Sequence, residues 1–140
     1  MTLVVDASIA LKWFIEEDGR DQALQVLELG QREAPDLIVA EVANAIWKKA
    51  VRGQVTDVQA HAVCAALPSY FEALHPAGAL VENAIGMGLA LRHPIYDCLY
   101  LACAARLQAR LVTADRRLLA AVADTEFASV AVHIDALVNT

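Results

Sequence analysis

The chain has 140 residues, a formal net charge of −6 and 58% hydrophobic residues. This apolar content excludes a disordered chain, which would be poor in apolar residues and richer in charge. The longest uninterrupted apolar run, Cys98 to Ala105, is too short for a membrane span, which needs about 20 residues.

Size and cysteine content predict a single cytoplasmic domain. Domains most often have about 100–150 residues, so we expect residues 1–140 to form one domain. No basic segment precedes the apolar residues at the N-terminus, which argues against a secretory signal. The 3 cysteines cannot all pair and form no CxxC motif, so a reducing cytosol is the expected compartment.

The first half of the chain predicts two buried strands separated by helices. The strands are residues 3–5, which end at Asp6, and residues 37–39, which follow a break at Pro35. The helices are expected at residues 9–15, 21–32, 41–52 and 56–67.

The second half repeats this alternation. It predicts strands at residues 70–74, 110–113 and 129–134, and helices at residues 78–92, 96–107 and 116–122. Short apolar strands that alternate with helices are typical of βαβ units, in which helices cover both faces of a parallel sheet. The sequence therefore predicts an α/β fold.

Four acidic residues are expected to meet at one edge of this sheet, because all strands of a parallel sheet end on the same edge and ligands gather there. Asp6 and Asp115 follow predicted strands directly, Glu41 follows the strand at 37–39, and Asp97 opens a helix. Acids are also favoured near helix N-termini as caps, so each one singly has a structural alternative. Their convergence favours a functional site.

Several carboxylates within a few ångström repel one another, and their pKa values rise unless a cation lies among them. The expected ligands are oxygens alone, which suits Mg²⁺ or Mn²⁺ rather than Zn²⁺. Such an ion lowers the pKa of a bound water and stabilises charge on a phosphate, so the pattern points to phosphoryl chemistry.

Three polar residues are candidates to support the acids. Ser8 lies two residues after Asp6, Thr113 lies two residues before Asp115, and Asn44 lies one helical turn after Glu41. The structural alternatives are capping of backbone groups for Ser8 and Thr113 and simple solvation for Asn44.

The same segments resemble a known family. The stretches are Val5-Asp6-Ala7-Ser8 with Trp13, Glu41-Val42-Ala43-Asn44, Tyr96-Asp97-Cys98-Leu99-Tyr100-Leu101-Ala102, and Leu111-Val112-Thr113-Ala114-Asp115. In this order they resemble the PIN-domain family, and most of all its VapC-type toxins. The resemblance covers essentially the whole chain. It implies a three-layer α/β/α fold with a central five-stranded parallel sheet.

The resemblance also implies a function. It implies a Mg²⁺- or Mn²⁺-dependent endoribonuclease that hydrolyses RNA to 5′-phosphate and 3′-hydroxyl ends, is blocked by an antitoxin protein and is usually a homodimer. Asp6, Glu41, Asp97 and Asp115 would form the acidic quartet, with Asp6, Asp97 and Asp115 as metal ligands. Some relatives carry a further acid just after the fourth. Here Arg116 and Arg117 follow Asp115, which puts a second well-held metal in doubt.

Other charged and aromatic residues have weaker functional interpretations. Lys12, Lys48 and Arg116 lie in segments that leave the predicted site edge and are candidates to steer RNA phosphates, with a solvated surface as the alternative. Trp13 and Trp47 offer rings for base stacking, but the position of Trp47 on an apolar helix stripe favours core or interface packing. The 4 histidines show no ligand spacing and are not expected to act.

Two other functions remain open. One is a PIN-like interaction module that keeps the fold without catalysis. The other is a Mg²⁺-dependent phosphatase of the haloacid dehalogenase type, in which the first Asp is a nucleophile. That reaction needs a second Asp two residues later, where this chain has Ser8.

Overall fold

The computed structural model describes residues 1–138, so residues 139 and 140 of the predicted domain lie outside the described part. Within it, five parallel strands form one sheet in the order β3-β2-β1-β4-β5. The predicted α/β class and the five-stranded parallel sheet are confirmed. The strands are β1 (Thr2–Val5), β2 (Gln31–Pro35), β3 (Ala73–His75), β4 (Arg110–Thr113) and β5 (Ala131–His133).

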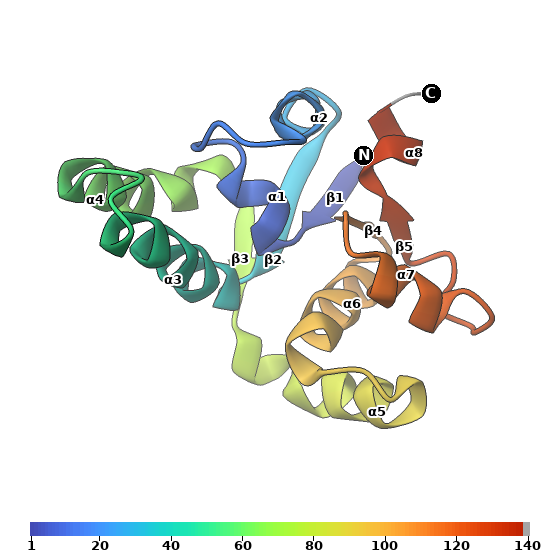
Figure 1. Ribbon diagram of the computed structural model, residues 1–140. Coiled ribbons are helices and arrows are strands. Elements are labelled where there is room, and N and C mark those ends of the chain that lie inside the picture. The colour runs from blue at the N-terminus through green and yellow to red at the C-terminus, as the bar shows by residue number, and fades with distance from the viewer. Residues whose placement is uncertain (139–140) are drawn as a thin grey trace.

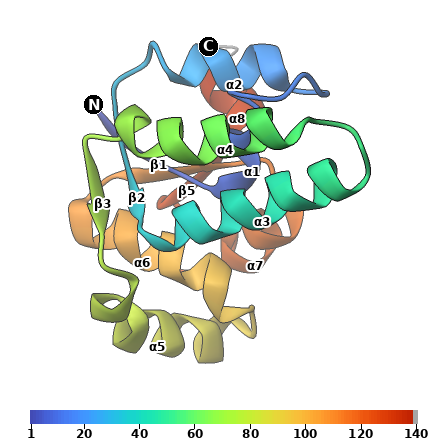
Figure 2. The same ribbon diagram turned by 90° about the vertical axis from the view of Figure 1, so that its left-hand side faces the viewer.

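Helices cover both faces of the sheet, which gives the expected three layers (Figure 1). The helices are α1 (Ala7–Leu11), α2 (Arg20–Val26), α3 (Leu37–Val51), α4 (Asp57–Ala66), α5 (Val81–Leu91), α6 (Ile95–Leu107), α7 (Arg116–Val122) and α8 (Ile134–Val138). The first four lie on one face, and α5, α6 and α7 lie on the other. Figure 2 shows α3 and α4 side by side, as their contacts require.

The strand order places the carboxyl ends of β1 and β4 side by side, with Val5 opposite Val112. After β1 the chain turns to the face of α1, whereas after β4 it turns to the face of α7 (Figure 1). Because the two connections leave in opposite directions, a crevice opens beyond these strand ends, where α/β proteins bind their ligands. Asp6 and Asp115 lie at that point of the fold.

The core is centred on β1, β4 and α6. Residues 3–5 and both Leu111 and Val112 are fully buried, and every residue from Cys98 to Ala104 in α6 is buried as well. The reason is that α6 lies between the sheet and α5 and therefore has apolar neighbours on most sides. Cys98 and Cys103 are free and buried, so they serve as small core residues.

The predicted second strand is wrong. Residues 37–39 begin α3, and the strand lies earlier, at Gln31–Pro35. The predicted helix at 21–32 is correspondingly shorter, because α2 ends at Val26. The apolar run at 37–39 belongs to a helical stripe whose members recur every four residues and are buried: Ile38, Val42 and Ile46.

The true strand escaped prediction because its sequence is polar. Arg32 in β2 donates hydrogen bonds to the backbone carbonyls of Leu27, Gly30 and Tyr70 over 2.9–3.1 Å. These carbonyls satisfy a charged side chain inside the sheet, so the strand needs no apolar run. The other predicted strands are found within a few residues of their expected places. In residues 1–138, no helix combines the length and apolar character that a membrane crossing requires.

Candidate active site and metal centre

Asp6 follows the last residue of β1 and is the N-cap of α1. Its Oδ1 accepts hydrogen bonds from the backbone N–H of Ile9 (3.1 Å) and the hydroxyl of Ser8 (2.7 Å), and its Oδ2 accepts one from the hydroxyl of Thr113 (2.5 Å). Burial raises the pKa of Asp6, and the charge of Asp97 acts in the same direction, against the three hydrogen bonds. The carboxylate is fixed in place, and no cationic side chain within residues 1–138 forms an ion pair with it.

Glu41 reaches the same place from inside a helix rather than from a strand end, which corrects its predicted position. Because α3 begins at Leu37, Glu41 lies in the second turn. The acid that does follow β2 is Asp36, and its Oδ1 accepts a hydrogen bond from the backbone N–H of Ala77 (2.9 Å). Asp36 therefore has a structural role.

The carboxylate of Glu41 is half-buried and paired with a phenol. The hydroxyl of Tyr100 in α6 donates to its Oε1 over 2.5 Å. Burial raises the pKa of Glu41, and the charges of Asp97 and Asp6 raise it further, whereas the bond from Tyr100 opposes the rise. Burial and the bond to Glu41 also raise the pKa of Tyr100, so its hydroxyl keeps its proton and remains a donor. Sequence reasoning quoted Tyr100 only within the family stretch and assigned it no role.

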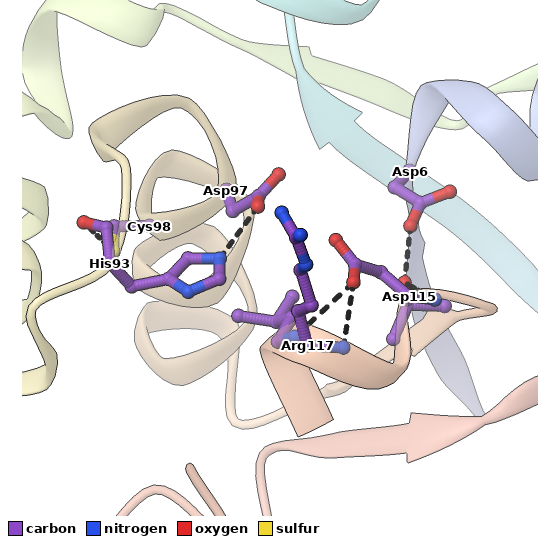
Figure 3. Close-up of polar contacts among 8 residues, drawn as sticks. Asp6, His93, Asp97, Cys98, Asp115 and Arg117 are labelled. Carbon is purple, nitrogen blue, oxygen red and sulfur yellow. Dashed lines mark hydrogen bonds and ion pairs between the residues drawn. The ribbon is translucent and has the colours of Figure 1, made fainter. Parts of the chain in front are cut away.

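Asp97 projects from the first turn of α6 and is paired with a histidine that the sequence analysis dismissed. Nε2 of His93 lies 2.7 Å from Oδ2 of Asp97 (Figure 3). No histidine is expected to act from the sequence alone, and His93 is notable against that expectation because its ring contacts one of the four acids. The sequence offered one indication of this contact: His93 lies four residues before Asp97, and Pro94, the N-cap of α6, lies between them.

Asp115 is the N-cap of α7 and lies beside the end of β4. Its Oδ1 accepts hydrogen bonds from the backbone N–H groups of Arg117 (2.9 Å) and Leu118 (3.2 Å). Its own backbone N–H donates to the hydroxyl of Thr113 (3.0 Å), which is the same hydroxyl that donates to Asp6. Asp115 thus caps α7 and also lines the pocket with the other three acids, so a capping role and a role in the site do not exclude each other.

The four acids line one pocket of about 410 Å³. Its remaining lining residues are Ala7, Ser8, Tyr100 and Ala114. Burial raises the pKa values of Asp6 and Glu41, and the charges of the neighbouring acids raise them further, so ionised carboxylates are disfavoured in this pocket. A divalent cation would compensate their negative charge, and carboxylate oxygens are the donors that Mg²⁺ and Mn²⁺ prefer. The residues present therefore fit such an ion.

Comparison with known proteins identifies the family. The model of the PIN domain matches residues 3–125, which is most of the chain. The chain belongs to the PIN domain family. Ribonuclease VapC3 of Pyrobaculum aerophilum is 33% identical over 121 residues, covering 84% of this chain and 92% of that protein. Ribonuclease VapC1 of Mycobacterium tuberculosis is 36% identical over 90 residues, covering 63% of this chain and 65% of that protein.

Solved structures share this PIN fold. The crystal structure of PAE2754 from Pyrobaculum aerophilum has a TM-score of 0.72 at 25% identity and covers 99% of this chain and 93% of that one. A toxin–antitoxin complex from Klebsiella pneumoniae contains a chain with a TM-score of 0.66 at 21% identity, covering 86% of this chain and 92% of that one. The second likeness concerns the fold alone.

The supporting residues lie at different distances from the PIN-domain pocket. Ser8 lines it, and Thr113 bonds directly to Asp6 behind it. Asn44 lies instead in a neighbouring cleft of about 280 Å³, which it shares with Glu41 and Tyr96. Asn44 is exposed and one step removed from the other acids.

The three candidate RNA-steering residues separate into two places. Lys12 and Arg116 line a cleft of about 360 Å³ that shares Ala114 with the pocket of the acids. Lys12 also pairs with Glu17 over 3.1 Å. Lys48 is exposed on α3 and does not line the pocket of the acids.

The two tryptophans have opposite environments. Trp13 is buried, and its ring stacks on Tyr70 with centroids 5.6 Å apart, so it is a core residue of the PIN fold. Trp47 is 59% exposed and lines an apolar groove between α3 and α4. Its ring is not part of the monomer core, which leaves interface packing and base stacking among the predicted roles.

Proposed function

We propose that the chain is a metal-dependent endoribonuclease that acts as the toxin of a toxin–antitoxin pair. The observation that supports this most strongly is the convergence of four carboxylates on one pocket at the sheet edge, with burial and mutual repulsion raising the pKa of two of them. The names of the curated relatives, ribonucleases VapC3 and VapC1, favour the same activity.

In this proposal Asp6, Asp97 and Asp115 hold the cation, with Mg²⁺ as the expected ion and Mn²⁺ as a substitute. The bound ion supplies a water of lowered pKa and neutralises charge on the scissile phosphate. Glu41 faces the same space and accepts a proton or orients the attacking water. The expected products carry 5′-phosphate and 3′-hydroxyl ends.

Polar neighbours fix the geometry of these acids. Ser8 and Thr113 hold the two oxygens of Asp6 in separate hydrogen bonds, so its carboxylate meets the ion already oriented. Asn44 supports Glu41 at the rim of the pocket. Each carboxylate oxygen that is already held in place reduces the reorganisation that the site must undergo when the phosphate binds.

RNA is proposed to approach past the basic residues. Lys12 and Arg116 line the cleft next to the pocket, and Lys48 lies on the exposed side of α3. Each phosphate contact of this kind makes binding weaker as salt rises. We therefore expect the apparent affinity for RNA to fall steeply with salt concentration.

We propose further that the chain works as one cytoplasmic domain of 140 residues, pairs with a second copy and is blocked by an antitoxin. Large apolar side chains remain exposed on α3 to α5, which is typical of proteins that bury surface on association. They are Trp47, Val51, Val58, Val81, Ile85 and Leu89. Light scattering of the purified chain tests the dimer, and a monomer would refute it.

The deciding experiment is cleavage of total RNA by purified protein freed of any partner, with Mg²⁺, with Mn²⁺ and with chelator. Asp6→Asn and Asp97→Asn test the pocket, and Asp124→Asn is the matched control, because it removes the same charge from an exposed position. We expect metal-dependent fragments from the wild type and from Asp124→Asn, and none from the two pocket variants.

Two outcomes would contradict the proposal. Equal fragments from the wild type and both pocket variants would mean that a contaminating nuclease produces them. No cleavage by a folded sample that binds Mn²⁺ would favour the catalytically inactive interaction module. End-group analysis of the fragments tests the predicted 5′-phosphate separately.

A further inference from the structure

His93 lies beside the acids and has no role in the function proposed above. Its Nε2 is 2.7 Å from Oδ2 of Asp97, and Figure 3 shows the ring turned toward that carboxylate. One ligand-type atom each from His93, Asp97 and Asp115 lie within 4.8 Å of one another. The His93 side chain is only 10% exposed, whereas that of Asp97 is 38% exposed. A ring that is largely shielded from solvent therefore contacts an acid that solvent can reach.

The backbone of His93 is held on both sides. α5 ends at Leu91, and Arg92 adopts the left-handed conformation (φ 53°), which turns the chain back across the helix end. The backbone N–H of His93 then donates to the carbonyl of Gly88 over 3.1 Å, and the thiol of Cys98 contacts the carbonyl of His93 at 3.7 Å. These contacts fix the backbone from which the ring projects.

Gly88 shows how close this approach is. A Cβ added at Gly88 would lie 3.1 Å from the carbonyl oxygen of His93, which is tighter than ordinary van der Waals contact. At Gly86, two residues earlier in α5, an added Cβ would meet nothing within 4 Å. The loop thus packs on the helix at a position where only glycine fits without adjustment.

The orientation of the Asp97 carboxylate depends on the His93 ring more than the orientation of the Asp6 carboxylate depends on any one of its partners. Three donors hold Asp6. Among residues 1–138, the hydrogen-bond partner that the structure gives the carboxylate of Asp97 is His93. The backbone of Asp97 is fixed at the start of α6, but its side chain is half exposed and needs a partner to select one orientation.

We propose that His93 is a positioning residue, whose Nε2–H holds Oδ2 of Asp97 and thereby directs the other carboxylate oxygen into the pocket as a metal ligand. The inference rests on the proposed metal-dependent nuclease and deepens it. While Nε2 donates to the carboxylate it has no lone pair free for a metal, so through this nitrogen His93 acts on the ion by way of Asp97. Outer partners of this kind contribute about 10–100-fold to metal affinity or activity.

The test compares Mn²⁺ binding and RNA cleavage for the wild type, His93→Ala and His93→Gln. Binding is measured from the electron paramagnetic resonance signal of free Mn²⁺, without RNA. The matched control is His75→Ala, because Nε2 of His75 lies 2.8 Å from Oε1 of Glu33 in an equally short pair that does not line the pocket. Thermal unfolding of each variant confirms that it is folded.

We expect His93→Ala to weaken Mn²⁺ binding by roughly 10–100-fold. Cleavage should recover toward the wild-type rate at saturating Mn²⁺, because His93 does not touch the reacting atoms. His93→Gln should restore part of the affinity, since its amide N–H reaches the place of Nε2. His75→Ala should bind Mn²⁺ as the wild type does.

Two results would overturn the inference. One is Mn²⁺ affinity within about twofold of the wild type in both His93 variants. The other is a directly coordinated nitrogen in the pulsed spectrum of Mn²⁺ on the wild type, which would make His93 a ligand itself. Failure of the wild type to bind Mn²⁺ or to cleave RNA would instead refute the proposed function. If His93→Ala does not fold, His93→Gln and the pulsed spectrum still decide.

Discussion

The buried hydroxyl of Thr113 joins two of the acids, and Thr113→Val removes it without opening a cavity. Oγ1 donates to Oδ2 of Asp6 (2.5 Å) and accepts the backbone N–H of Asp115 (3.0 Å), and the side chain is 0% exposed. Valine places a methyl group where the hydroxyl was. Both hydrogen bonds are therefore lost while nearly the same volume stays filled.

The expected loss of stability follows from these two bonds. A hydrogen bond to a charged group contributes about 1.5–3 kcal/mol, and a backbone N–H left unpaired costs about 1–3 kcal/mol. Asp6 keeps its bonds from Ser8 and Ile9, and Asp115 is partly exposed to water, so we expect a combined loss of about 2–3 kcal/mol. For a chain of this length that lowers the midpoint of thermal unfolding by roughly 6–12 °C.

The loss should depend on pH with a definite sign. The bond from Thr113 lowers the pKa of Asp6, which means that it stabilises the ionised carboxylate more than the neutral one. Its removal therefore costs most where Asp6 is ionised. The cost shrinks as pH falls through the pKa of Asp6, which burial has raised.

The assay is unfolding in urea with chelator present, at pH 7.5 and pH 5, for the wild type, Thr113→Val and Thr113→Ser. Serine keeps the hydroxyl and loses one methyl group, so it should cost about 1 kcal/mol at either pH. The reasoning is refuted if Thr113→Val costs less than about 0.5 kcal/mol or no more than Thr113→Ser, since either result would mean that the two bonds contribute little.

Two of the three further predictions concern the same pocket, and one concerns the two glycines of α5. In chelator, Asp6→Asn should be more stable than the wild type by about 1 kcal/mol at pH 7.5, and the difference should shrink at pH 5. The reason is that burial raises the pKa of Asp6, so the folded wild type takes up a proton at this carboxylate as pH falls. Thermal unfolding of both proteins at the two pH values measures the difference. Gly86→Ala should stabilise the chain by about 0.5–1 kcal/mol, because alanine favours the helix and its Cβ meets open space. Gly88→Ala should give no such gain, because its Cβ crowds the carbonyl oxygen of His93. The midpoints of urea unfolding of the two variants are compared with each other. Tyr100→Phe should cost about 1–2 kcal/mol and slow RNA cleavage several-fold, because Glu41 loses its phenol donor. An unchanged cleavage rate would show that Glu41 needs no such partner.

The fold could be predicted where the strands are apolar. Residues 3–5 and 110–113 lie in the middle of a sheet covered on both faces, so their apolar runs are obligatory and easily recognised. β2 could not be recognised in this way, because Arg32 is satisfied by backbone carbonyls and Glu33 by His75. One local signal was present. A Cβ at Gly30 would overlap the carbonyl oxygen of Met1, so a glycine is required where the chain turns into β2.

The meeting of the four acids could be predicted even though one premise was wrong. Asp6 and Asp115 follow strands that end side by side, and the switch in chain direction between those strands makes their meeting unavoidable. Glu41 was placed by a strand that does not exist, yet its position in the second turn of α3 brings it to the same pocket. The family resemblance was therefore a better guide to Glu41 than the predicted element was.

The partners of the acids could not be predicted, for a different physical reason. Tyr100 meets Glu41 only because α6 and α3, which cover opposite faces of the sheet, both reach the pocket at its edge. His93 meets Asp97 only because Arg92 takes a left-handed conformation that the sequence does not announce with a glycine or asparagine. Strand ends are fixed by the topology of the sheet, whereas these contacts depend on the approach of helices and the shape of one loop. Because such contacts orient the carboxylates, variation in metal affinity among related chains should arise at positions like these rather than at the four acids themselves.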